Sequence, residues 1–238
     1  MIWWEVAIIA GVVVVATALQ GSIGFGLGML AAPVIGLIDP TVLPGIVIML
    51  AIVVTAIVAL RERASLDLAG AGWALVGRVP GSVAGAALVA VLPAKGLAVL
   101  VALVVLGGVG LSLVGWKPAP TRIGLVSAGA ASGILGTSTS IGGAPMALIW
   151  QRFDGPQLRG TMAAFFLVGS SLSLVALVAF GAVTEATLTL AVWLLPAVLA
   201  GYALSRFANT LLDKRRLRIT ALAASSLGAV MLIVAQVV

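Results

Sequence analysis

Long apolar runs separated by short charged hinges dominate the sequence. Six of these runs have the length of a plain membrane span, because a helix of about 20 apolar residues crosses the ~30 Å hydrocarbon core of a bilayer. The six runs are Val42–Leu60, Leu68–Ala94, Gly96–Trp116, Gly160–Thr184, Ala186–Ser205 and Ile219–Val238. The pattern predicts an all-α integral membrane protein.

Two further runs do not fit a single plain span. Val6–Ile38 would be about 50 Å long as one straight helix, and it contains the stretch GSIGFGLGMLAAP. Ile123–Trp150 carries GTSTSIGGAP in its middle. Glycine inside a helix costs about 1 kcal/mol relative to alanine, so we expect each run to break at its glycine-rich or hydroxyl-rich stretch.

The two broken runs are copies of one another. At an offset of 112 residues the coincident pairs are Gly21 and Gly133, Gly24 and Gly136, Ala32 and Ala144, Pro33 and Pro145, and Pro44 and Pro156; at an offset of 116 they are Pro80 and Pro196, Ala84 and Ala200, and Gly85 and Gly201. Glycine and alanine are common in this chain, so the three proline pairs carry the inference. We therefore expect an internal duplication, with repeats over residues 1–116 and 117–238 that together form one membrane domain.

Charge placement separates two topologies. If each broken run crosses the membrane once, the hinge with Arg61 and Arg63 lies opposite the basic stretch 214–218, against the tendency of Lys and Arg to stay cytoplasmic. If each run enters and leaves by the same side, the hinge cations share one face except Lys95. The second arrangement is favoured. It predicts two inverted-topology repeats in the cell inner (plasma) membrane, each a re-entrant helical hairpin plus three transmembrane helices, with both termini outside the cytoplasm.

The tips of the two hairpins are the candidate binding site. The arms Val6–Leu19 and Met29–Ile38 would be about 21 and 15 Å long, which reaches the middle of the membrane. Broken backbone there is tolerated where it lines a wet cavity, and inverted-repeat transporters bind substrates at such breaks. Each returning arm would begin with free N–H groups, near Gly26 and Gly28 or near 138–141, which favour an anion. The candidate substrate-binding residues are Gly21, Ser22, Gly24, Gly26, Gly28, Gly136, Thr137, Ser138, Thr139, Ser140, Gly142 and Arg78. The alternative is that the small residues only permit close helix packing.

Arg78 is the basic residue well inside a span. Intramembrane charges mark pathways, but its side chain could instead snorkel to the interface. For Gly77, Gly81 and Gly85, close helix packing is favoured over ligand contact. Gln20 and Asn209 are further polar residues that could line a cavity.

Composition narrows the chemistry. The chain is 62% hydrophobic and 8% charged, with a mean hydropathy of +1.29, and its net charge of +6 is better explained by membrane anchors than by nucleic acid. It contains no Cys and no His. No predicted span holds a carboxylate in its middle, since Asp39, Asp154 and Glu185 all lie at edges of the apolar runs. We therefore expect no catalytic residues, no metal site and no cofactor. The expected partners are a small anionic substrate and membrane lipids, and a homodimer is left open.

The doubled pattern GSIGFGLGMLAAP and GILGTSTSIGGAP resembles the TauE/SafE sulfite exporter family over essentially the whole chain. The positions that match the family's signature are Gly21, Gly24, Gly26, Gly28 and Pro33, with Gly133, Gly136, Gly142, Gly143 and Pro145. The sequence departs from the pattern where Thr137–Ser140 replaces further glycines. The resemblance implies a secondary transporter, in the direction of export, of a small sulfur-containing anion such as sulfite or an organosulfonate. A passive anion channel would need a continuous polar path, and a non-transporting scaffold would need tight apolar packing at both tips.

Overall fold

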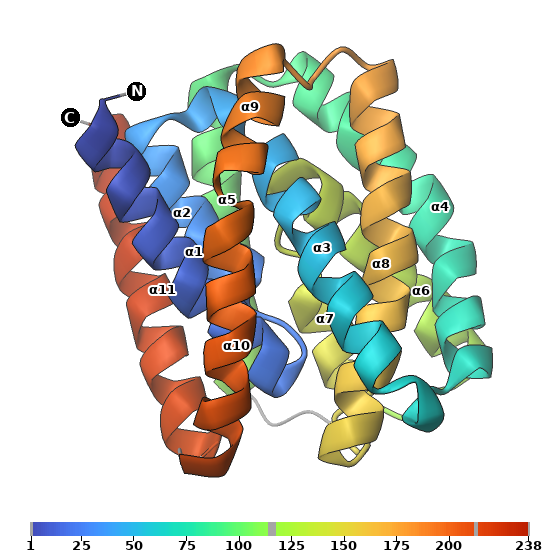
Figure 1. Cartoon of the computed structure of the whole chain (residues 1–238). Helices are drawn as coiled ribbons and strands as arrows, with labels where there is room; N and C mark the ends of the chain where they lie inside the picture. The colour runs from blue at the N-terminus through green and yellow to red at the C-terminus, as the bar shows by residue number, and fades with distance from the viewer. Residues whose placement is uncertain (1, 114–117, 212–213, 238) are drawn as a thin grey trace.

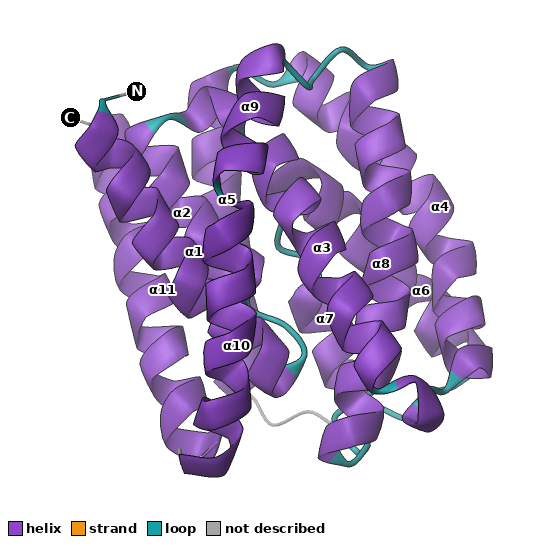
Figure 2. Ribbon diagram, viewed as in Figure 1, coloured by secondary structure: helices purple, strands orange, loops and turns teal. Residues whose placement is uncertain are grey.

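The computed structural model describes residues 2–113, 118–211 and 214–237, and every regular element in these ranges is a helix (Figure 2). The α-helices are α1 (Trp3–Ile23), α2 (Leu27–Ile38), α3 (Gly45–Arg61), α4 (Leu68–Val91), α5 (Ala94–Leu113), α6 (Arg122–Thr139), α7 (Gly143–Ile149), α8 (Gly155–Ala179), α9 (Glu185–Trp193), α10 (Leu195–Leu211) and α11 (Lys214–Val237). Two short 3₁₀ helices, η1 (Pro40–Val42) and η2 (Arg63–Ser65), flank α3.

Both long runs break at the stretches that the sequence singles out. Gly24 ends α1 with φ 92°, and Gly26 precedes α2 with φ 125°. These backbone angles suit glycine, because a Cβ atom disfavours positive φ. The second run breaks after α6, where Ser140 adopts a left-handed φ of 65°. We call residues 24–28 the first tip, which includes the first two residues of α2, and residues 140–142 the second tip.

The helix before the first tip is longer than expected, and the arms of the second hairpin are unequal. α1 has 21 residues, about 31 Å, against the expected arm of about 21 Å. α6 has 18 residues, about 27 Å, whereas the returning helix α7 has only 7. Both α1–α2 and α6–α7 pack as helix pairs, and the chain reverses direction within each (Figure 1).

The predicted spans are recovered in part. Within the described residues four helices are long and apolar enough to cross a membrane, namely α1, α4, α5 and α8. The expected span Ala186–Ser205 is instead a pair of helices, α9 and α10, bent by 42°. The helix α3 and the apolar part of α11, Leu222–Ala235, are shorter apolar helices. In Figure 1 the start of α1 and the end of α11 lie together at the top, and the end of α3 and the start of α8 lie at the bottom.

Glycine brings α4 and α6 into backbone contact. A Cβ atom added at Gly77 or Gly81 would collide with the carbonyl of Val126 or Ala130 on α6. One added at Gly85 would lie 2.7 Å from the carbonyl oxygen of Ile134. The expectation of close helix packing for Gly77, Gly81 and Gly85 is confirmed. This contact holds the middle of α4 against most of the length of α6, which ends next to the second tip.

Candidate functional site

A small cavity lies where the two tips meet. Its volume is about 40 Å³, which is room for roughly three water molecules, since one needs about 10–15 Å³ by this measure. Its lining residues come from α1, the first tip, α2, α3, α4, α6, the second tip, α7 and α8: Gln20, Phe25, Gly26, Leu27, Gly28, Met29, Val47, Ile48, Ala51, Arg78, Gly136, Ser140, Ile141, Gly142, Gly143, Phe166 and Ser170.

The residues at the start of α2, whose backbone N–H groups begin the helix, line this cavity. The N–H of Leu27 donates to Oε1 of Gln20 at 3.1 Å, which orients the start of α2. The first intrahelical bond runs from the N–H of Leu30 to the carbonyl of Gly26. The N–H groups of Gly28 and Met29 therefore have no carbonyl acceptor within α2. They lie at the positive end of the helix dipole.

The second tip touches the first directly. A Cβ atom on Gly28 would collide with the backbone carbonyl of Ser140, so only glycine fits there without movement. The hydroxyl of Ser140 donates to the carbonyl of Pro44 at 2.9 Å, just before α3. The returning helix α7 begins at Gly143, later than the expected 138–141.

Arg78 extends from the middle of α4 into the same cavity. Its Nη1 donates to the carbonyl and to Oγ of Ser132, at 2.8 and 2.7 Å. Its Nη2 donates to Oγ of Ser173 at 3.4 Å. The guanidinium also lies over the rings of Phe165 and Phe166, at 5.3 and 5.7 Å from their centroids. The side chain is 2% exposed, so the snorkelling alternative is wrong.

The charge of Arg78 has no carboxylate partner in the described part of the chain. Among the residues that the structure describes, no Asp or Glu lines the cavity. The Nε atom of Arg78 finds no acceptor among the described residues. A buried charge is costly unless it is paired, and the neutral serines and ring faces compensate it only partly. The arrangement therefore favours an anion in the cavity.

The remaining candidate glycines and Ser22 lie outside the cavity lining. Gly21 packs on α10, where an added Cβ would be 2.6 Å from Oγ of Ser205. The Ser22 hydroxyl donates to a carbonyl one turn earlier in its own helix, at 2.8 Å. At Gly24 the added atom would be 3.2 Å from Cα of Arg159. These residues shape the hairpin and its supports.

The hydroxyl run reaches the cavity at one position only. Thr137 shares a hydrogen bond of 2.7 Å with Ser173. Ser138 and Thr139 donate to carbonyls four residues earlier in α6, at 2.7 and 2.6 Å. Of the run Thr137–Ser140, Ser140 lines the cavity, together with the flanking candidates Gly136 and Gly142.

Two serines that support Arg78 escaped sequence reasoning. The Ser132 hydroxyl accepts a hydrogen bond from Nη1 of Arg78 and donates one to the carbonyl of Gly142 at 2.7 Å. This links the guanidinium to the second tip. Ser173 donates to the carbonyl of Gly169 at 2.8 Å. A usable signal was a polar residue in the middle of an apolar run. Gln20 does line the cavity, whereas the side chain of Asn209 lies outside those described.

The apolar helices and the polar centre define a multi-pass integral membrane protein. The family model "Sulfite exporter TauE/SafE" matches residues 8–232 of the chain, and the chain belongs to this family. The family consists of membrane transporters, not enzymes, which confirms the class expected from the sequence. No curated protein and no solved structure matches the chain.

Proposed function

We propose that this protein is a secondary transporter that exports a small sulfur-containing anion, such as sulfite or an organosulfonate. The anion binds in the cavity between the two tips, near the middle of the membrane. The observation that carries the proposal is the buried guanidinium of Arg78. It lacks a carboxylate partner among the described residues and lines the same cavity as the start of α2. Arg78 and the N–H groups of Gly28 and Met29 offer an oxyanion donors on two sides.

The proposal includes re-entrant hairpins in two inverted repeats, 1–116 and 117–238. The packing of the helices supports this symmetry. α1 packs on α10 whereas its counterpart α6 packs on α4, and α2 packs on α11 whereas its counterpart α7 packs on α5. In Figure 1 the α1–α2 pair opens toward the top of the molecule and the α6–α7 pair toward the bottom.

A ligand screen on the purified protein tests the substrate class. We expect sulfite to raise the thermal unfolding temperature in a concentration-dependent way, since a ligand that binds only the folded state stabilises it. Sulfate, thiosulfate, sulfoacetate and taurine form the comparison series. Taurine should give the smallest shift, because its ammonium gains nothing from Arg78 or a helix N-terminus. Equal, null shifts for all five compounds would contradict the proposal.

Two serine variants test the second tip. Ser140 lines the cavity, and we expect its hydroxyl to exchange the carbonyl of Pro44 for the bound anion. Ser140→Ala should then weaken sulfite binding by about 1–3 kcal/mol, the range for hydrogen bonds to charged groups, or roughly five- to 150-fold in Kd. Ser138→Ala is the matched control, because its hydroxyl donates to Ile134 within α6 and lies outside the cavity lining. Calorimetry on both variants measures the difference. Equal affinities for the two variants would remove Ser140 from the site.

A reporter fused to the C-terminus tests the topology. In the plasma membrane, the hinge cations should face the cytoplasm. Both termini should then lie on the opposite, non-cytoplasmic side. A fluorescent protein that does not mature in the periplasm should therefore stay dark at the C-terminus of the chain. The same reporter inserted in the α3–α4 hinge serves as the positive control. Bright cells from the C-terminal fusion would refute the re-entrant arrangement.

A further inference from the structure

The first tip lies between the cavity and the start of α8. On one side, Phe25 and Gly26 line the cavity. On the other, Gly24 approaches the backbone of Arg159 so closely that an added Cβ would be 3.2 Å from its Cα. Phe25 also contacts the second hairpin, since a Cβ on Gly143 would be 3.1 Å from Cβ of Phe25. The tip therefore covers the cavity toward the end of the molecule where α3 ends and α8 begins, which we call the basic end.

An ion pair ties α3 to α8 beside this tip. Nη2 and Nε of Arg159 donate to Oε1 of Glu62 at 2.8 and 3.2 Å. Both side chains are mostly buried, 12% and 13% exposed. The N–H of Asp67 adds a bond to Oγ1 of Thr161 at 3.0 Å. Since α3 and α8 both line the cavity, the ion pair holds these two walls together at the basic end. The Asp67 bond ties the start of α4 to α8 beside it.

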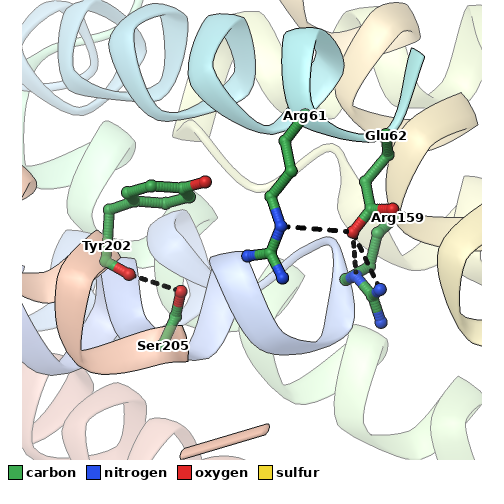
Figure 3. Close-up of polar contacts among 5 residues, drawn as sticks. All are labelled: Arg61, Glu62, Arg159, Tyr202 and Ser205. Carbon is green, nitrogen blue, oxygen red and sulfur yellow. Dashed lines mark hydrogen bonds and ion pairs between the residues drawn. The ribbon is translucent and has the colours of Figure 1, made fainter. Parts of the chain in front are cut away.

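Arg61 also approaches Glu62, but more loosely. Its Nε lies 3.8 Å from the same Oε1, and its side chain is 37% exposed. Figure 3 shows Arg61 reaching from α3 and Arg159 from α8 toward one carboxylate. The shorter and more buried contact dominates, because exposed pairs are screened by water.

The opposite end of the cavity has no charged counterpart within the described part of the chain. At the offset of 112 residues that relates the repeats, the position of Arg159 is held by Val47. The neighbouring walls of α3, α4 and α8 pack there through the buried apolar residues Ile48, Ala86, Val89 and Leu177. One end is thus held by a polar contact and the other by apolar packing.

We infer that the Glu62–Arg159 ion pair is a latch that keeps the first tip closed over the cavity at the basic end. The inference rests on the proposed function for the role of the cavity, and it concerns access rather than binding. Breaking the latch leaves a mostly buried charge without this partner, so it shifts the population toward states in which α3 and α8 separate. Water and solutes then reach the cavity from the basic end.

Cysteine labelling tests the latch, because the chain contains no cysteine of its own. Ala51→Cys places a reporter in the cavity wall, and Ala64→Cys in the α3–α4 hinge marks which membrane face carries the basic end. Both are exposed to a charged, membrane-impermeant methanethiosulfonate reagent in spheroplasts and in inside-out vesicles. We expect Glu62→Gln and Arg159→Gln each to raise the labelling rate of Cys at position 51 about tenfold, only from the face that labels position 64.

Three controls make the outcome specific. Arg61→Gln should leave the rate within about twofold, because its contact with Glu62 is long and exposed. The exchange of Glu62→Arg with Arg159→Glu should restore a rate near the parent's. Ala102→Cys, fully buried in the core, should stay unlabelled in every variant, which excludes global unfolding.

The latch is overturned if both single variants label at the parent rate. It is also overturned if Arg61→Gln matches them or if the charge exchange fails to restore the parent rate. Sulfite calorimetry on the unsubstituted protein is read separately. A protein that binds no anion refutes the proposed function, whereas the labelling rates still decide whether Glu62 and Arg159 control access.

Discussion

Replacing Arg78 by glutamine should weaken sulfite binding by about 30- to 1,000-fold, or roughly 2–4 kcal/mol. The guanidinium is the charged group in the cavity lining, and the polar contacts of the variant offer no net charge to an anion. Arg78→Lys keeps the charge but loses the planar guanidinium that Ser132 and Ser173 hold. The affinity of Arg78→Lys for sulfite should therefore fall between those of the parent and Arg78→Gln. Isothermal titration calorimetry with sulfite measures all three proteins.

Arg122→Gln is the matched control for the Arg78 variants. In the parent, the Arg122 guanidinium also lies over an aromatic ring, 5.0 Å from the centroid of Trp73. Arg122 is the first residue of α6 and does not line the cavity. The affinity of Arg122→Gln for sulfite should equal that of the parent. Circular dichroism melting without ligand shows whether each variant is folded. A folded Arg78→Gln protein with parent affinity would place the anion elsewhere.

Replacing Gly28 by alanine should lower sulfite flux by about tenfold or more. The added methyl group meets the backbone carbonyl of Ser140, which cannot rotate away as a side chain could. Overpacking of this kind costs about 1–3 kcal/mol, and the tips must separate to relieve it. Gly28→Leu should abolish flux, because the larger side chain also covers the N–H groups at the start of α2. Proteoliposomes loaded with sulfite measure the flux.

The same substitution elsewhere in the chain is the control. Gly107→Ala and Gly110→Ala on α5 place a methyl group where no atom lies within 4 Å. Both should transport at the parent rate, and the melting temperatures of all variants should be compared. If Gly28→Ala transports like Gly107→Ala, contact between the tips is not needed for function.

The sequence predicts the helical breaks well because their causes are local. Gly24 and Gly26 adopt positive φ, and that preference belongs to the residue itself. The bend between α9 and α10 was missed, although Pro196 follows it directly. A hydropathy profile gives the length of an apolar run but does not register a bend in the helix axis. Pro80 shows why the proline alone would not have settled the matter, since it lies inside the continuous helix α4.

A charged residue caused the predicted start of one span to be placed too late. α8 begins at Gly155, capped by the Asp154 side chain, which accepts from the N–H of Gln157 at 2.8 Å. The apolar pattern instead started this span at Gly160, because Arg159 interrupts it. The structure accommodates Arg159 through Glu62, which is distant in the sequence. Pairing of this kind is tertiary and leaves no local signal.

The candidate site was predicted at its tips but not around Arg78. Glycines and hydroxyls at the breaks can be read directly from the sequence. The support for the guanidinium comes from α6 and α8, through Ser132 and Ser173. Which helices face Arg78 depends on the packing of the whole chain, so no spacing rule along α4 could identify these partners.

The glycine contact between α4 and α6 has a mechanical consequence. Gly77 and Gly81 on α4 meet α6 carbonyls, and Gly129 on α6 meets the carbonyl of Ala74 in return. Backbones that contact each other closely at these glycines on both helices resist sliding past each other. We therefore expect α4 and α6 to move as one rigid unit. Arg78 is rooted in one helix and the second tip ends the other. We therefore expect that, if this helix pair tilts, Arg78 and the second tip move together and the distance between them is kept.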